Sequence, residues 1–120
     1  MRTCDTLTAR IWLGVPAEIS EGQRDLMVAQ CVPAGLNVAV VPVTYIGPAM
    51  DRAGVYQAYM ERGMMVVLIN VPDRPLAAFC ETAKGLAVRL RYTFQQSRCT
   101  LQAPGLTWLV EERGNVDGDS

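Results

Sequence analysis

Apolar side chains recur at spacings of three and four residues between Asp73 and Gln96. The positions that share this spacing are Leu76, Phe79, Ala83, Leu86, Leu90 and Phe94. Such spacing is typical of one face of an α-helix, here about five turns long. Asp73 offers a side-chain cap before the first turn, and Pro75 suits an early helical position because its missing N–H is not needed there. The pattern predicts a long helix whose apolar face packs on a sheet or on other helices.

Strand patterns occupy much of the remaining chain. The predicted strands are residues 6–15, 36–46, 64–71, 97–101 and 106–111. The first alternates apolar and polar residues, whereas 64–71 is almost continuously apolar and is expected at the centre of the sheet. Pro42 places its own strand at a sheet edge or a bulge, because proline cannot donate to a ladder. Pro104-Gly105 suits a turn, so the last two strands are predicted to form a hairpin.

A second, shorter helix is predicted to begin at Ser20. Ser20-Glu21-Gly22-Gln23 fits the capping box, in which the hydroxyl and the amide satisfy free backbone N–H groups reciprocally. The helix is expected to end near Cys31, with Gly35 available for a left-handed cap. Its predicted buried face consists of Leu26, Met27, Cys31 and Ala34.

The segment 47–63 is open to two interpretations. Asp51 could cap a short helix that runs to Arg62, or 55–60 could be a strand that leads through Gly63 into the next one. The segment is rich in tyrosine and contains Met60, so it is a candidate contact surface; its aromatic residues could equally complete the core.

The order of elements predicts an α+β fold. Strand, helix, strand, strand, helix and strand form a ferredoxin-like split βαβ sandwich (βαββαβ), whose last strand is extended as a hairpin. Two helices would cover one face of the sheet. Trp12 could face outward on the other, where a homodimer is plausible. Residues 1–112 are predicted to form a single domain, and 113–120 a flexible acidic tail.

Composition narrows the class of protein further. Half of the 120 residues are apolar and 19% are charged, as expected of a folded chain. No apolar run approaches the roughly 20 residues that a membrane-spanning helix needs, and no signal-peptide pattern is present. We therefore expect a cytoplasmic protein with no membrane partner. The net charge of −1 makes nucleic acid an unlikely partner.

Most common catalytic motifs are missing from the sequence. The chain has no histidine, and its four cysteines show no C-x-x-C spacing. It contains no Walker loop, no G-x-G-x-x-G and no G-x-S-x-G. Cys31, Cys80 and Cys99 fall at or beside core-facing positions, as small apolar residues do. We therefore predict no metal, no cofactor and no enzymatic activity, with a thiol or carboxylate enzyme as a minor alternative.

The end of the long helix carries a short motif. Phe94-Gln95-Gln96-Ser97 resembles the F-x-Q-E-S end of the second helix in a small bacterial and phage family with no established activity, although one residue of that motif is missing here. The resemblance implies a ferredoxin-like fold across residues 9–110. The chain is also similar in style to phage anti-defence proteins such as anti-CRISPR inhibitors.

These observations predict a non-catalytic interaction protein, carried by a phage or mobile element, that binds and inhibits a host defence protein complex. The candidate residues for a protein partner are Arg52, Tyr56, Tyr59, Met60 and Arg62. The alternative is a sponge-like protein that binds a nucleotide or another small anion, because arginine pairs with phosphate and tyrosine stacks on bases. Its candidate residues are Arg89, Arg91 and Arg98, with Tyr45 and the tyrosines named above.

Overall fold

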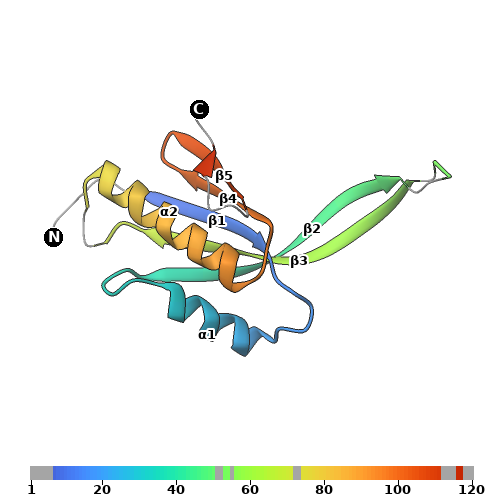
Figure 1. Cartoon of the computed structure of the whole chain (residues 1–120), viewed down its shortest axis with the longest axis horizontal. Coiled ribbons are helices and arrows are strands. Elements are labelled where there is room, and N and C mark those ends of the chain that lie inside the picture. Colours follow the sequence, from blue (N-terminus) through green and yellow to red (C-terminus); the bar gives the residue numbers. More distant parts are fainter. Residues whose placement is uncertain (1–6, 51–52, 55, 72–73, 112–115, 118–120) are drawn as a thin grey trace.

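The computed structural model describes residues 7–50, 53–54, 56–71, 74–111 and 116–117, and it describes 48–50, 56–59 and 116–117 by their backbone alone. Within these ranges the elements follow in the order β1 (Thr8–Gly14), α1 (Glu21–Cys31), β2 (Val38–Met50), β3 (Tyr56–Ile69), α2 (Leu76–Thr93), β4 (Arg98–Ala103), β5 (Leu106–Glu111) and β6 (Val116–Asp117) (Figure 1).

The strands form one antiparallel sheet in the order β2-β3-β1-β4-β5-β6. The helix α2 crosses one face of this sheet over β1 and β4, and α1 lies beside α2 (Figure 1). The predicted α+β class is confirmed. The sheet has two strands more than a simple four-stranded ferredoxin-like sandwich, so its strand order differs from that fold. β6 falls within the segment predicted to be a tail, and the rest of 113–120 lies outside the described residues.

The core lies between the sheet and α2. The predicted stripe on α2 is fully buried from Phe79 onward, whereas Leu76 at its start is 50% exposed. Alternate residues of β1 face the helices, so Ile11 and Leu13 are buried while Trp12 between them lies on the open face. Burying each large side chain contributes roughly 1.5–3 kcal/mol, so these rows hold the sheet against α2.

The face that α1 buries agrees with the predicted one at Cys31, which is buried, and at Met27, which packs against the core, but not at Leu26. Its buried residues are Arg24, Val28 and Cys31, while Leu26 is 67% exposed. Positions 24, 28 and 31 form an i, i+4, i+7 stripe, so the true face is turned away from Leu26. Arg24 buries its aliphatic stem, and its guanidinium is 3.1 Å from the Asp25 carboxylate. The capping box of Ser20 and Gln23 is confirmed. No helix in the described part is long and apolar enough to cross a membrane.

Residues 47–50 and 56–63 lie in two strands, so the helix interpretation is wrong. β2 and β3 pair along their whole length, from Val38 with Leu68 to Met50 with Tyr56. β1 pairs with β3 only as far as Gly63. Beyond that point β2 and β3 continue as a two-stranded arm that projects from the sheet (Figure 1). β2 is an edge strand, as Pro42 indicated.

Candidate functional site

Two glycines pair at the point where β1 ends and only β2 and β3 continue, as the arm. Gly14 of β1 pairs with Gly63 of β3. A Cβ at Gly63 would be 2.8 Å from both Tyr45 Cδ2 and the Leu13 carbonyl oxygen. A Cβ at Gly14 would be 2.6 Å from Gln96 Oε1. The missing side chains therefore make room for the Tyr45 ring and the Gln96 amide to lie against the backbone.

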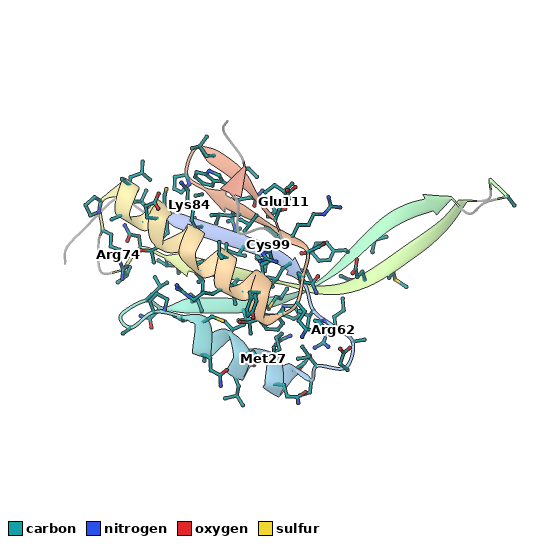
Figure 2. All side chains as sticks on the ribbon, viewed as in Figure 1. Met27, Arg62, Arg74, Lys84, Cys99 and Glu111 are labelled. Atoms are coloured by element: carbon teal, nitrogen blue, oxygen red, sulfur yellow. The ribbon has the colours of Figure 1, made fainter. Side chains whose placement is uncertain are left out.

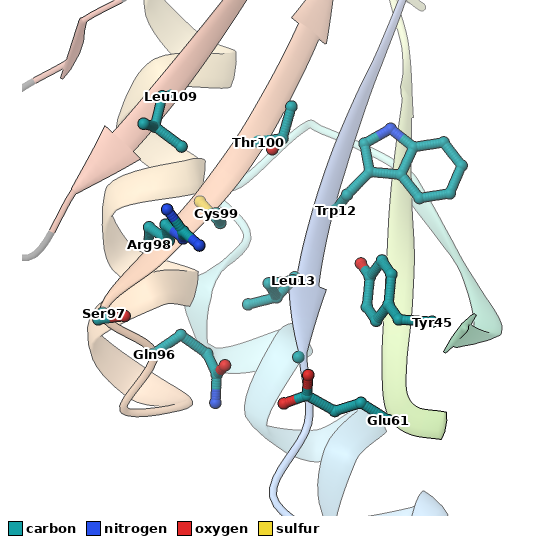
Figure 3. Close-up of a pocket in the computed structure, with 11 residues that line it drawn as sticks. Trp12, Leu13, Tyr45, Glu61, Gln96, Ser97, Arg98, Cys99, Thr100 and Leu109 are labelled. Carbon is teal, nitrogen blue, oxygen red and sulfur yellow. The ribbon is translucent and has the colours of Figure 1, made fainter. Parts of the chain in front are cut away.

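A pocket of about 520 Å³ opens beside these glycines, on the face of the sheet away from the helices (Figure 3). Its lining residues come from β1, β2, β3, β4, β5 and the α2–β4 connection. They are Trp12, Leu13, Gly14, Tyr45, Glu61, Gln96, Ser97, Arg98, Cys99, Thr100 and Leu109. The volume is typical of a site for a small organic ligand.

Tyr45 supplies an unused polar group to the pocket. Its hydroxyl is buried and has no hydrogen-bond partner. Burial, followed by the Cys99 thiol and the Glu61 carboxylate, raises the pKa of Tyr45 above its ordinary value. The phenol therefore stays neutral and can donate a hydrogen bond. A buried hydroxyl without a partner costs roughly 1–3 kcal/mol, which a bound ligand would recover.

Trp12 supplies a second aromatic ring. Its Nε1–H donates to Gln102 Oε1 at 2.8 Å, which fixes the orientation of the indole on the open face. In Figure 3 the rings of Trp12 and Tyr45 lie on the same side of the pocket. Two aromatic faces can stack on a planar aromatic ring of a ligand, and they also attract cations.

The charged residues of the pocket are Glu61 and Arg98. Tyr45 and Glu61 are directly opposite each other in the β2–β3 ladder, beyond the end of β1. Both charged side chains are exposed, and neither forms an ion pair with any other described residue. They remain available to a ligand that carries charges of both signs.

Gln96 is held in place by the end of α2. Gln95 adopts a left-handed conformation with φ 55°, and the Gln96 N–H donates to the Arg91 carbonyl at 2.9 Å. These features define a Schellman turn, formed here without glycine. The Arg91 guanidinium donates back to the Gln96 carbonyl at 2.9 Å. The turn thus delivers the Gln96 side chain to the pocket.

Cys99 lines the pocket as a buried, neutral thiol. Burial raises the pKa of its thiol to about 12, and the Arg91 guanidinium lowers it only in part. Cys99 Sγ lies 3.7 Å from the Ala87 carbonyl oxygen, as expected of a core thiol. Within the described residues, no three His, Cys, Asp or Glu side chains gather as a metal site would require.

The residues predicted for a protein partner lie on or near the arm. Arg52 is outside the described residues, and Tyr56 and Tyr59 are described by their backbone in β3. Met60 is 76% exposed. Arg62 is occupied, because its guanidinium donates to the carbonyls of Pro16 and Ile19 and ties the β1–α1 loop to β3 (Figure 2).

The residues predicted for an anion site are divided between two places. Arg89 donates to the Cys31 carbonyl at 3.0 Å, and Arg91 is only 6% exposed. These two line a pocket between α1 and α2, whereas Arg98 lines the pocket on the open face of the sheet. Trp12, Glu61 and Gln96 were not predicted as site residues. The sequence feature that could have pointed to them is the presence of Gly14 and Gly63 in or beside strand patterns. Glycine in a strand often marks a place where another group approaches the backbone closely.

No protein-family model matches the chain, and no curated protein is similar to it. Among solved structures, the fold is similar to that of two phage enzymes. A phage SAM lyase in its apo state has 16% sequence identity and a TM-score of 0.53, covering 92% of this chain and 83% of that one. A phage SAM lyase in complex with S-methyl-5′-thioadenosine has 19% identity and a TM-score of 0.50, covering 92% and 84%.

These neighbours overturn the functional prediction from the sequence. Both are enzymes, and neither is an inhibitor or an anti-CRISPR protein. The prediction of a non-catalytic protein that inhibits a host defence complex is therefore wrong, as is the prediction that the chain is not an enzyme. The lack of histidine and of nucleotide-binding motifs does not by itself exclude catalysis. No finding bears on the F-x-Q-E-S resemblance, and the homodimer stays a prediction.

Proposed function

We propose that this chain is an S-adenosylmethionine (SAM) lyase, which binds SAM in the pocket of Gly14 and Gly63 and releases S-methyl-5′-thioadenosine. The observation that carries the proposal is the buried, unpartnered hydroxyl of Tyr45 in a pocket that also holds Trp12 and Glu61. The likeness of fold to two phage SAM lyases supports it.

The pocket matches the chemical groups of SAM. The purine needs a flat aromatic surface, and the rings of Trp12 and Tyr45 offer one. The sulfonium is a cation without N–H donors, so aromatic faces stabilise it better than hydrogen-bond acceptors do. Glu61 gives the pocket a negative charge that suits a cationic substrate. Arg98 on the rim attracts the substrate carboxylate, although its exposure keeps this contribution small.

The reaction can proceed without an added acid or base. The substrate carboxylate attacks its own γ carbon and forms the C–O bond of a five-membered lactone. The bond between the γ carbon and sulfur breaks, and its electron pair stays on sulfur as the neutral thioether of S-methyl-5′-thioadenosine. No proton moves, and two opposite charges disappear. The route needs no imidazole base, and a partly apolar lining favours the loss of charge.

The proposal extends to the finer fold and the location. We propose that β2-β3-β1-β4, with α1 and α2, forms a ferredoxin-like split βαβ core to which β5 and β6 are added; the interleaving of β1 between β3 and β4 supports this. The chain would act in the cytoplasm, where SAM is available.

The test is turnover of SAM by the purified chain, with products identified by mass spectrometry. We expect equal amounts of S-methyl-5′-thioadenosine and homoserine lactone. When the reaction is run in H₂¹⁸O, newly formed lactone should carry no label. Label at the γ hydroxyl of homoserine would show attack by water and refute ring closure.

Two variants connect the activity to the pocket. Tyr45→Phe removes one hydrogen bond and should lower kcat/KM roughly 10-fold. Glu61→Gln should lower it by a similar or larger factor. Glu81→Gln, on the exposed side of α2, is the matched control and should leave turnover unchanged. If the folded chain leaves SAM intact, or if the control falls as far as Glu61→Gln, the proposed site is wrong.

A further inference from the structure

Two hydrogen-bond acceptors approach the end of β1, one from each side of that strand. Figure 3 shows the carboxylate of Glu61 on one side and the amide of Gln96 on the other. Glu61 extends from β3, two residues beyond the Gly14–Gly63 pair. Gln96 extends from the turn after α2. Elements far apart in the sequence thus place both groups at one corner of the pocket.

The hydrogen bonds fix which end of the Gln96 amide faces this corner. Nε2 donates to the Phe94 carbonyl at 3.1 Å, which is possible only for the NH₂ group. Oε1 is therefore turned toward Gly14, where it lies 2.6 Å from the position that a Cβ would occupy. No described protein group donates to this oxygen or to the Glu61 carboxylate. The corner therefore offers two acceptors, one of them charged.

We infer that Glu61 and Gln96 Oε1 bind the α-ammonium group of the substrate, so that the amino-acid half of SAM occupies the Gly14 corner and its purine lies against Trp12 and Tyr45. This inference rests on the proposed function. An ammonium group has three donors and a positive charge, which a carboxylate and an amide oxygen satisfy together. The purine carries fewer donors and has no charge, so it gains more from the aromatic side.

This orientation has a consequence for the reaction. Holding the ammonium group at a fixed corner limits rotation of the amino-acid chain. The carboxylate on the same carbon can then remain near the γ carbon that it attacks, which favours ring closure by proximity. Arg91 acts here as a positioning residue, because its guanidinium holds the Gln96 carbonyl.

The experiment measures affinities of three nucleosides by calorimetry, on the wild type and on Gln96→Leu. The probes are S-methyl-5′-thioadenosine, which lacks the amino-acid half; S-adenosylhomocysteine, which keeps the ammonium group; and its analogue with hydrogen in place of the amino group. Loss of a hydrogen bond to a charged group should weaken S-adenosylhomocysteine roughly 10- to 100-fold. The other two probes should change less than about 3-fold.

Matched variants and the pattern across probes separate the possible outcomes. Gln30→Leu makes the same change on the exposed surface of α1 and should alter none of the affinities. Partial unfolding of Gln96→Leu would reduce the binding of all probes equally, so the ratio between probes isolates the ammonium contact. Equal weakening of all three would overturn the inference and leave the proposed function standing. If the wild type binds none of them, the proposed function fails and the inference fails with it.

Discussion

Replacing Gly63 with alanine places a methyl group where the Tyr45 ring lies. The new Cβ would be 2.8 Å from Tyr45 Cδ2 and 2.8 Å from the Leu13 carbonyl oxygen, against an ordinary contact of at least 3.4 Å. The Leu13 carbonyl must therefore move by about 0.6 Å, and the Tyr45 ring, whose Cε2 would be only 2.1 Å from the new Cβ, by about 1.3 Å. The ring can turn toward solvent, but the carbonyl belongs to β1 at the centre of the sheet. Overpacking of this kind costs about 1–3 kcal/mol.

The free energy of unfolding, measured with urea and followed by circular dichroism, should fall by that amount in Gly63→Ala. The melting temperature should drop by roughly 4–15 °C. Affinity for S-methyl-5′-thioadenosine should fall more than stability does, because the displaced ring forms one wall of the pocket. Adding Tyr45→Ala should restore part of the stability, since it removes one of the two clashes.

Gly22→Ala is the matched control for this experiment. Its Cβ would meet nothing within 4 Å, and Gly22 lies within α1, where alanine is favoured by about 0.5–1 kcal/mol. It should therefore be neutral or stabilising. The reasoning is refuted if Gly63→Ala unfolds within about 0.5 kcal/mol of the wild type and binds the nucleoside equally well.

Two further predictions concern a thiol and a helix cap. Burial raises the pKa of Cys99 from its ordinary 9.0 to about 12. The folded thiol therefore stays neutral while the unfolded one ionises, and the resulting stability is present below pH 9 and is lost as the pH rises toward 12. The urea midpoint should thus fall less between pH 8 and pH 10.5 in Cys99→Ala than in the wild type, and equal falls would contradict the burial of this thiol. Ser20→Ala removes the capping box of α1 and should cost about 1 kcal/mol in the same urea assay, with no change in turnover; an unchanged midpoint would mean that the cap contributes nothing.

The sequence predicted best what depends on local pattern. The stripe from Phe79 to Phe94, the capping box at Ser20 and the edge position of Pro42 are all confirmed. Each follows from chemistry within a few residues. The buried face of α1 was predicted only in part: Cys31 and Met27 do pack inward, but Leu26 is apolar and exposed while Arg24 is buried. Only the docking of α1 beside α2 decides which of its sides is covered.

The candidate site could not be predicted in the same way, because its parts meet only in the folded sheet. Tyr45 and Glu61 become neighbours through the β2–β3 register, and Gln96 reaches them only because α2 ends in a turn beside β1. Gly14 and Gly63 indicated a close approach of some group. Which group approaches depends on pairing between residues 49 positions apart in the chain, as the Gly14–Gly63 register shows.

The pocket exists because neighbouring strands differ in length. β3 has 14 residues and β1 has 7, so β1 stops at Gly14 while β3 continues into the arm. Beyond the end of β1 the open face of the sheet is uncovered on one side, and Tyr45 and Glu61 occupy the first positions there whose side chains are on that face, two residues past the Val43–Gly63 pair. A chain in which the arm is cut back to the Val43–Gly63 pair would keep the core beneath α2 but would lose both residues. The shortened chain would also lose the hydrogen bonds of Arg62 to the β1–α1 loop, so some stability should be lost. Turnover should nevertheless be abolished while the buried rows of β1 and α2 still fold.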